Sequence, residues 1–447
     1  MIDMELTRRR FLRWFGLVAL GGMNLNLAGC GAKSLTGRLL HAAAQGGAEP
    51  PPVPATFLKR NDLGAVPQKG IFTGFRGRLI TLAQLSDIHI TLDDFSLTGY
   101  PGLEALLDGF GDAIGFGGLD RPEPQEHFDV DVLRAVVKTL NASTDHIDLV
   151  LNTGDSLDIG TMPELISFLS EMNNLEIPWF QTIGNHDRLG LGNIPPGLLE
   201  AFSDLDFIDK QSFIEKHFPG MGDPGVDAFG SNAKGFDFSP GFEGFAESSR
   251  GFYTFTALPP IHGDPGQLLQ PGIRFYVLNS SRRAGTAMGR LDSEQLRWLS
   301  EELEGHSGYL AIIVSHHPIQ NMMDGRQELV RLLLHHPQVV ALLCGHEHEH
   351  RIKAFAHPGN PARGFWQIQT ASLIDFPQQP RILEISNNAD GTGTIRTFVF
   401  NQQAGGDLGK NALASYQSAK GEAFDGSGTP ADRDVALLFQ MPDAREG

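Results

Sequence analysis

Cysteine is almost absent from this chain, which has two in 447 residues. Cys30 lies near the N-terminus, in a segment we expect to be processed, and Cys344 ends an apolar stretch that predicts a buried strand. Cysteines in such different settings predict no structural disulfide. The fold must then depend on a hydrophobic core, for which an apolar content of 41% is ample.

Basic residues are also scarce. The 35 Lys and Arg stand against 53 Asp and Glu, which gives a formal net charge of −18 at pH 7. A surface this acidic repels polyanions, so we expect no nucleic-acid partner. A small anionic substrate is not excluded, because bound cations can attract it.

Long apolar runs are missing too. The moderately apolar stretch 14–27 contains Gly16, Gly21 and Gly22, and it is too short and too rich in glycine to span a bilayer comfortably. It follows Arg8-Arg9-Arg10-Phe11, and the whole resembles a twin-arginine signal at residues 1–29. The sequence therefore predicts export rather than a permanent membrane helix.

Two processing sites compete after this signal. Leu27-Ala28-Gly29-Cys30 resembles a lipoprotein cleavage box, which would attach a lipid to Cys30, whereas Ala42-Ala43-Ala44 offers an ordinary signal-peptidase site. Residues 30–70, rich in Pro and Gly, are expected to form a linker. We therefore expect a periplasmic protein or a lipoprotein anchored on the outer face of a membrane.

The chain contains a repeated pattern in which short apolar runs end in polar side chains. The run Leu149–Asn152 leads to Gly154-Asp155, and such a run reads as a buried strand of a largely parallel sheet. Side chains at the carboxyl ends of these strands face ligands. The pattern recurs in Asp87-Ile88-His89, Gly184-Asn185-His186-Asp187, His316-His317 and Gly345-His346-Glu347-His348.

This ordered set of blocks resembles the calcineurin-like metallophosphoesterase family, over residues 79–400. The resemblance implies an α/β fold, a two-sheet sandwich flanked by helices in four αββα layers. We expect this domain at 71–400, with long insertions near 93–128 and 188–250, and a loosely attached extension at 401–447. A short helix is possible near 410–423.

The periodicity places the regular elements. Helices are expected at 129–140, 164–172 and from Asp292 or Ser293 to 303, and strands at 78–86, 149–152, 177–182, 251–256, 273–279, 309–315, 339–344, 364–370, 381–386 and 393–400.

The family resemblance also assigns roles in a centre of two divalent ions, whether Fe, Mn or Zn. It implies that one ion is bound by Asp87, His89 and His348, the other by Asn185, His316 and His346, and that Asp155 bridges them. His186 would face the substrate and Asp158 would orient it. His317 would point away from the ions on an extended backbone, so we expect it to have a supporting role, and His335, His336 and His350 are expected at the surface.

The implied function is hydrolysis of a small phosphate mono- or diester by a hydroxide that the two ions activate. One rival is a lipid-anchored binding protein that keeps the fold without the activity. Another is a zinc protease, because His346 to His350 also satisfies H-E-x-x-H. That motif works only on a helix, and Gly345 before it favours a strand followed by a loop.

Overall fold

The computed structural model describes residues 50–68, 72, 76–91, 128–143, 146–158, 160, 162–187, 237–238, 251–263, 267–281, 287–402, 408, 410, 413 and 425–442. All of them belong to one of the two units into which the chain divides. The predicted signal, Cys30, both predicted cleavage sites and almost all of the two predicted insertions lie outside these residues. So does most of the possible helix at 410–423.

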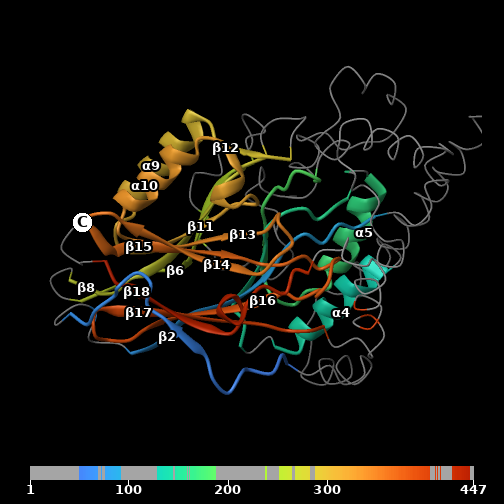
Figure 1. The fold of residues 1–447 in the computed structure, drawn as a ribbon, viewed down its shortest axis with the longest axis horizontal. Helices are drawn as coiled ribbons and strands as arrows, with labels where there is room; N and C mark the ends of the chain where they lie inside the picture. The colour runs from blue at the N-terminus through green and yellow to red at the C-terminus, as the bar shows by residue number, and fades with distance from the viewer. Residues whose placement is uncertain are drawn as a thin grey trace, which may run out of the picture. The chain divides into compact units, whose positions relative to one another are not determined.

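One seven-stranded sheet contains the first strands of the domain. In spatial order its members are β1 (Leu58–Arg60), β18 (Val435–Gln440), β17 (Thr392–Val399), β16 (Arg381–Asn387), β2 (Gly77–Leu85), β3 (Leu149–Asn152) and β4 (Trp179–Gln181). Strands β2, β3 and β4 are parallel, so their carboxyl ends lie at one edge. Strands β16, β17 and β18 continue the sheet antiparallel (Figure 1).

The second seven-stranded sheet has a similar plan. Its order is β14 (Arg351–His357), β15 (Asn360–Gln369), β13 (Val339–Cys344), β11 (Tyr309–Val314), β9 (Gly272–Val277), β6 (Tyr253–Leu258) and β5 (Asp237–Phe238). Strands β9, β11, β13 and β15 are parallel. Strands β9, β11 and β13 are almost fully buried, as the apolar runs of β11 and β13 predict. Strands β14, β6 and β5 are antiparallel to their inner neighbours.

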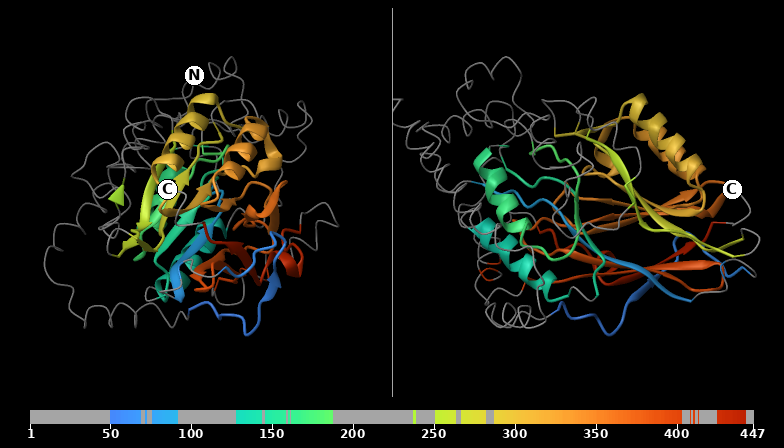
Figure 2. Two further views of the ribbon diagram at one scale, coloured as in Figure 1. Left: turned by 90° about the vertical axis from the view of Figure 1, so that its left-hand side faces the viewer. Right: turned by 180° about the vertical axis from the view of Figure 1, so that it is seen from behind.

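Helices cover the two sheets separately. The helices α9 (Ser293–Gly305) and α10 (Arg326–His335) lie together on one side of the second sheet (Figures 1 and 2). They bury Leu299, Leu303, Leu329 and Leu333 in a core shared with β11 and β13. The Asp292 carboxylate caps α9 by accepting from the Gln295 N–H, as predicted. The other pair, α4 (Asp129–Asn141) and α5 (Met162–Met172), follows β2 and β3 in the crossovers between parallel strands. The sequence analysis did not predict α10.

Adjacent residues of β4 show how the layers stack. Trp179 meets Phe168 of α5 edge-on, with ring centroids 6.0 Å apart. Phe180 points to the other face, where its ring stacks on Phe255 of the second sheet at 3.8 Å. This is the period-2 alternation of a strand buried on both faces. The prediction of a two-sheet α/β sandwich flanked by helices is therefore confirmed.

Short elements complete the described part of the fold. They are the pair β7 (Ile261–His262) and β8 (Leu268–Gln270), the pair β10 (Gly289–Arg290) and β12 (Met322–Asp324), and the 3-10 helices η6 (Ile319–Asn321) and η7 (Pro430–Asp432). Among the residues described, no helix is long and apolar enough to cross a membrane.

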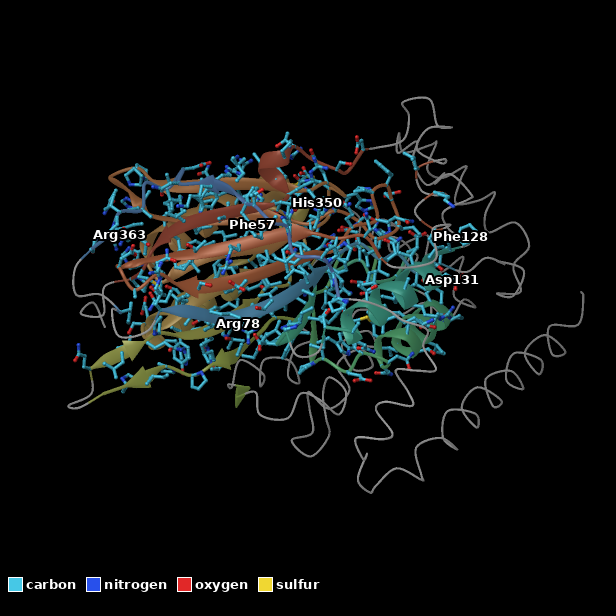
Figure 3. All side chains as sticks on the ribbon, turned by 90° about the horizontal axis from the view of Figure 1, so that it is seen from below. Phe57, Arg78, Phe128, Asp131, His350 and Arg363 are labelled. Carbon is cyan, nitrogen blue, oxygen red and sulfur yellow. The ribbon has the colours of Figure 1, made fainter. Side chains whose placement is uncertain are left out.

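The sandwich extends beyond 71–400 at both ends. Strand β18 pairs with β17, and β1 pairs with β18 in the region expected to be linker. Phe57, which lies next to β1 and is labelled in Figure 3, packs edge-on against Phe398. The prediction of a loosely attached C-terminal extension is wrong for 435–440, because this apolar run is buried as the partner of β17.

Candidate metal centre

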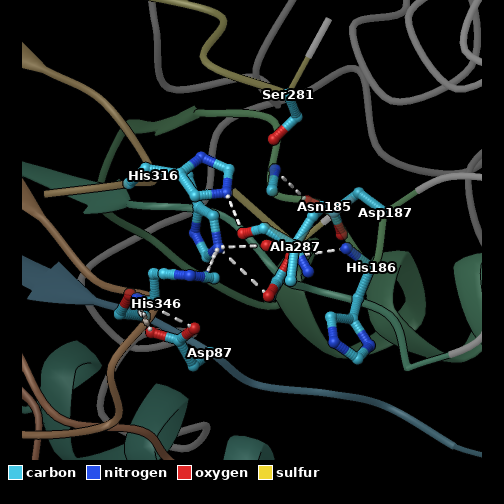
Figure 4. A network of polar contacts seen from close by, with 12 residues as sticks. Asp87, Asn185, His186, Asp187, Ser281, Ala287, His316 and His346 are labelled. Atoms are coloured by element: carbon cyan, nitrogen blue, oxygen red, sulfur yellow. Dashed lines mark hydrogen bonds and ion pairs between the residues drawn. The ribbon is translucent and has the colours of Figure 1, made fainter. Parts of the chain in front are cut away.

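The predicted ligands lie together where the parallel strands of both sheets end. Asp87 and His89 follow β2, Asp155 follows β3, and Asn185 and His186 follow β4. From the second sheet, His316 follows β11, and His346 and His348 follow β13. Figure 4 shows Asp87, Asn185, His316 and His346 in one network of polar contacts. Polar side chains from segments far apart in sequence thus meet at one edge of the sandwich.

Five of the predicted ligands have an unusual backbone conformation. A positive φ is found at Asp87 (50°), His89 (47°), Asp155 (51°), His346 (76°) and His348 (52°). Residues with a Cβ rarely adopt this left-handed region, and each such case costs about 1–3 kcal/mol. The surrounding structure must stabilise them, and their concentration at one place marks a functional site.

Two glycines allow the strand ends to approach one another. A Cβ on Gly184 would overlap the Asp155 side chain, and a Cβ on Gly345 would overlap Ser86 and Asp87. The glycine in Gly-Asn-His and Gly-His-Glu-His therefore provides space for a carboxylate from a neighbouring strand.

We call Asp87, His89 and His348 the first ligand set. The Nε2 atoms of His89 and His348 are 3.2 Å apart, and Oδ1 of Asp87 lies 3.4 Å from Nε2 of His348. On the far side of each imidazole, Nδ1 faces a carboxylate, Asp158 for His89 at 3.1 Å and Asp375 for His348. Each ring therefore directs Nε2 toward the centre of the set.

We call Asn185, His316 and His346 the second ligand set. Nε2 of His316 lies 3.1 Å from Oδ1 of Asn185, 3.2 Å from Nδ1 of His346 and 3.1 Å from Oδ2 of Asp155. On its other side His316 donates through Nδ1 to the Thr153 carbonyl oxygen at 2.9 Å. Asp155 also lies 3.8 Å from Nε2 of His89, so its carboxylate stands between the two sets.

The donors fit divalent cations. With Nδ1 of His89 and His348 directed at carboxylates, their Nε2 atoms lie 3.2 Å apart, where a cation would replace a proton. Buried imidazole, carboxylate and amide donors are also the mixture that binds Fe, Mn or Zn. The candidate metal-binding groups include Asp87–His89–His348, Asp87–Asp155–His316 and His89–Asp155–His186.

Electrostatics keep the central carboxylates ionised. Burial would raise the pKa of Asp155, but His316, His186 and His89 hold it well below its usual range. Burial likewise opposes ionisation of Asp87, yet His348 and His316 bring its pKa to about 2. Carboxylates in turn favour the charged form of the imidazoles. Asp87 and Asp375 raise the pKa of His348 to about 10 despite its burial. The site is thus ready to hold positive charge.

His186 is partly exposed beside the two sets. Its backbone N–H donates to Oδ1 of Asp155 at 2.8 Å, and its ring lies edge-on to His89. Its Nδ1 lies 2.7 Å from the carbonyl oxygen of Asp158 and 3.7 Å from the carboxylate of that residue. The sequence analysis expected the carboxylate to orient His186. The structure gives the hydrogen bond to the carbonyl, and the carboxylate lies nearer to His89.

Two acidic residues without a predicted role also serve this region. Asp187 accepts from the backbone N–H groups of Ser156 (2.6 Å), Leu157 (3.1 Å) and Gly184 (2.8 Å), which joins two ligand loops. Burial, together with nearby Asp155, raises the pKa of Asp187 to about 7. The other is Asp375, which pairs with His348 and lies in the loop after β15.

His317 is buried beside His316, with both ring nitrogens occupied. Its Nδ1 lies 2.8 Å from the Ser280 hydroxyl and its Nε2 3.0 Å from the Ala287 carbonyl oxygen. His336 and His350, expected at the surface, are buried instead, so that prediction is wrong. His350 is fully buried, and its Nδ1 accepts hydrogen bonds from the Ala371 N–H and from the guanidinium of Arg381, which offset the loss of water.

The histidine tract 346–350 is not helical. Strand β13 ends at Cys344 and β14 begins at Arg351, and bends connect them. His346 and His350 therefore do not share a helix face, which rules out the zinc-protease alternative.

Fold and site together define a metal-binding α/β sandwich with its centre at the strand ends. Residues 80–350 match the family model of calcineurin-like phosphoesterases. The chain therefore belongs to the calcineurin-like phosphoesterase family, a class of hydrolases that act on phosphoric ester bonds.

Curated relatives include two probable phosphodiesterases. A probable glycerophosphodiester phosphodiesterase of Arcobacter nitrofigilis is 25% identical over 214 residues, which cover 45% of this chain and 56% of the relative. A probable cyclic nucleotide phosphodiesterase of Moraxella catarrhalis is 25% identical over 143 residues, which cover 28% of this chain and 50% of the relative. The chain thus spans about half the length of the curated relatives it matches.

Similar solved structures include a dimetal phosphatase from Danio rerio, with a TM-score of 0.43 and 13% identity, covering 73% of this chain and all of that one. A purple acid phosphatase from yellow lupin has a TM-score of 0.39 and 12% identity, covering 81% of this chain and 54% of that one.

Proposed function

We propose that this protein hydrolyses a small phosphoric ester at a centre of two divalent ions. The observation that carries the proposal is the convergence of both ligand sets on Asp155, whose carboxylate lies within 3.8 Å of His89 and 3.1 Å of His316. A bridging carboxylate between two groups of mixed donors suits a pair of ions.

In this proposal Asp87, His89 and His348 hold one ion, and Asn185, His316 and His346 hold the other. When bound, the ions would lower the pKa of a coordinated water and neutralise charge on the phosphoryl group. The donors are compatible with Fe, Mn or Zn.

His186 is the proposed catalytic residue. Its Nδ1 donates to the Asp158 carbonyl, which fixes the tautomer and leaves Nε2 to contact a phosphoryl or leaving-group oxygen. It is partly exposed, whereas Asp87, His89 and His316 are fully buried, so a substrate can reach it. Asp158 positions His89 through its carboxylate and His186 through its carbonyl.

We propose a small phosphodiester as the substrate. The printed names of both curated relatives are those of phosphodiesterases, for glycerophosphodiesters and for cyclic nucleotides respectively. The net charge of −18 supports a small anion over a nucleic acid.

Export remains our proposal for the location. It depends on the arginine-rich segment at Arg8-Arg9-Arg10 and on the cleavage box before Cys30, both outside the described residues. Labelling with a radioactive fatty acid in cells that express the full chain would test it. Cys30→Ala should remove the label if the anchor is a lipid on that cysteine.

A substrate panel with defined metals tests the activity. Full-length protein, stripped of metal and reloaded with Mn, Zn or Fe, should hydrolyse bis(p-nitrophenyl) phosphate faster than p-nitrophenyl phosphate. Preference for the monoester would overturn the diester proposal. A purified chain that takes up no metal and turns over neither ester would favour the non-catalytic binding protein.

A further inference from the structure

The loop that follows β15, residues 370–380, contacts the first ligand set from behind. The Ser372 hydroxyl donates to the Asp87 carbonyl oxygen at 2.8 Å, and the Leu373 N–H donates to the same oxygen at 3.1 Å. Asp87 has a strained backbone with φ of 50°, so these two hydrogen bonds help to hold its carboxylate in place.

The same loop provides the carboxylate that faces His348. Asp375 pairs with Nδ1 of His348, while its own N–H donates to Ser372 Oγ at 3.2 Å and its carbonyl accepts from the Gln378 N–H at 2.7 Å. The backbone of Asp375 is thereby fixed through both its N–H and its carbonyl group. One short turn thus supports Asp87 through its backbone and His348 through its ring.

The C-terminal segment 425–434 ties this loop to the histidine tract. The Gly426 N–H donates to the Phe376 carbonyl at 3.0 Å, and the Gly426 carbonyl accepts from the His350 N–H at 2.9 Å. A Cβ at Gly426 would overlap the His348 carbonyl, so only glycine allows this approach. Both the loop and this segment lie outside residues 80–350, which the family model covers.

We propose that Asp375 is a positioning residue for the first ion. Its carboxylate fixes the tautomer and direction of the His348 ring, and the segment 425–434 holds the loop that presents it. Carboxylates that accept from a ligating imidazole typically change metal affinity by roughly 10–100-fold. This inference rests on the proposed two-ion centre.

Calorimetric titration of Mn²⁺ into metal-free, full-length protein tests the role. Asp375→Asn should weaken one of two binding events roughly 10–100-fold and leave the other unchanged. Asn185→Ala identifies the second event, and Asp375→Asn must weaken the opposite one. Glu384→Gln is the matched control, because it also removes a partly exposed carboxylate. Glu384 lies in the middle of β16 and pairs with Arg396 of β17.

The outcomes separate the inference from the function on which it rests. If the wild-type chain binds two ions and Asp375→Asn binds both with unchanged affinity, the positioning role is wrong and the two-ion centre stands. If both events weaken together and the metal-free variant melts earlier than Glu384→Gln, Asp375 merely supports the fold, which also overturns the inference. A wild-type chain that binds fewer than two ions overturns both.

Discussion

The two ligand sets differ in what lies behind their imidazoles. In the first set, His89 and His348 are each backed by a carboxylate, Asp158 and Asp375. In the second set, His316 is backed by the Thr153 carbonyl, and Asn185 supplies a neutral amide. A carboxylate behind a ligating histidine raises its basicity more than a neutral carbonyl does. In the proposed two-ion centre, the first ion should therefore bind more tightly than the second, although Asp155 would contact both.

The largest effect is expected where the two sets meet. Asp155→Asn should remove both ions and reduce turnover below detection, because its carboxylate faces His89 and His316 at once. Metal analysis by mass spectrometry and a chromogenic diester assay would measure both losses. Retention of one tightly bound ion would show that the sets are more independent than the geometry indicates.

His186 lies beside the two sets without belonging to either. His186→Gln should reduce turnover roughly 10²–10⁴-fold, the usual contribution of a general acid or base, and keep both ions. Parallel measurements of kcat and metal content would check this. Loss of an ion from this variant would contradict the assigned role and move His186 into the metal-binding group that includes His89 and Asp155.

The convergence of the candidate ligands was predictable from sequence because each follows a strand within a few residues, and the family resemblance supplied their proposed roles. Asp375 was not predicted, because it lies six residues beyond β15 in a loop whose course depends on the Asp87 carbonyl. Asp187 was visible in Gly-Asn-His-Asp, yet its acceptor role appears only when Ser156 and Leu157 are brought next to it.

Prediction of the fold was limited in the same way, because strand pairing depends on residues far apart in sequence. The two sheets follow from buried apolar runs, but β1 is three largely polar residues that form a strand only because β18 offers its edge. Strand β18 itself has the apolar sequence VALLF and carried a local signal. Its distance from the other strands concealed its partner, since pairing is a tertiary property that local propensity does not determine.

Asp158 offers a direct test of the difference between the sets. Asp158→Asn should weaken the first ion roughly 10–100-fold and leave the second unchanged, because its carboxylate contacts His89. The Thr153 carbonyl behind His316 cannot be removed by substitution, so Asn185→Ala serves as the reference for the second ion. Equal weakening of both ions by Asp158→Asn would contradict the proposed difference between the two ligand sets.

The metal-free protein should lose stability as the pH rises. Burial opposes protonation of His316 and His348, but Asp155 and Asp87 raise their pKa values to about 9 and about 10. A histidine whose pKa is higher in the folded than in the unfolded protein stabilises the fold fully at a pH below its unfolded pKa of 6.5. This contribution is lost as the pH rises through the folded pKa values of about 9 and about 10.

Thermal unfolding between pH 6 and pH 10 would measure this loss. The metal-free protein should show a falling melting temperature, and the loaded protein a smaller change, because bound cations replace the protons. A metal-free curve parallel to the loaded one would contradict the assigned ion pairs.

The smallest effect is expected at His317, which contacts His316 and His346 without a free ring nitrogen. Its Nδ1 and Nε2 are occupied by Ser280 and Ala287, so it supports the second set through packing and hydrogen bonds. His317→Gln should keep both ions and destabilise the fold by about 1–3 kcal/mol, the cost of leaving a buried polar group unsatisfied. Denaturant unfolding and metal content would check this. If the second ion were lost while stability stayed unchanged, His317 would be a ligand, and the second set would gain a third imidazole.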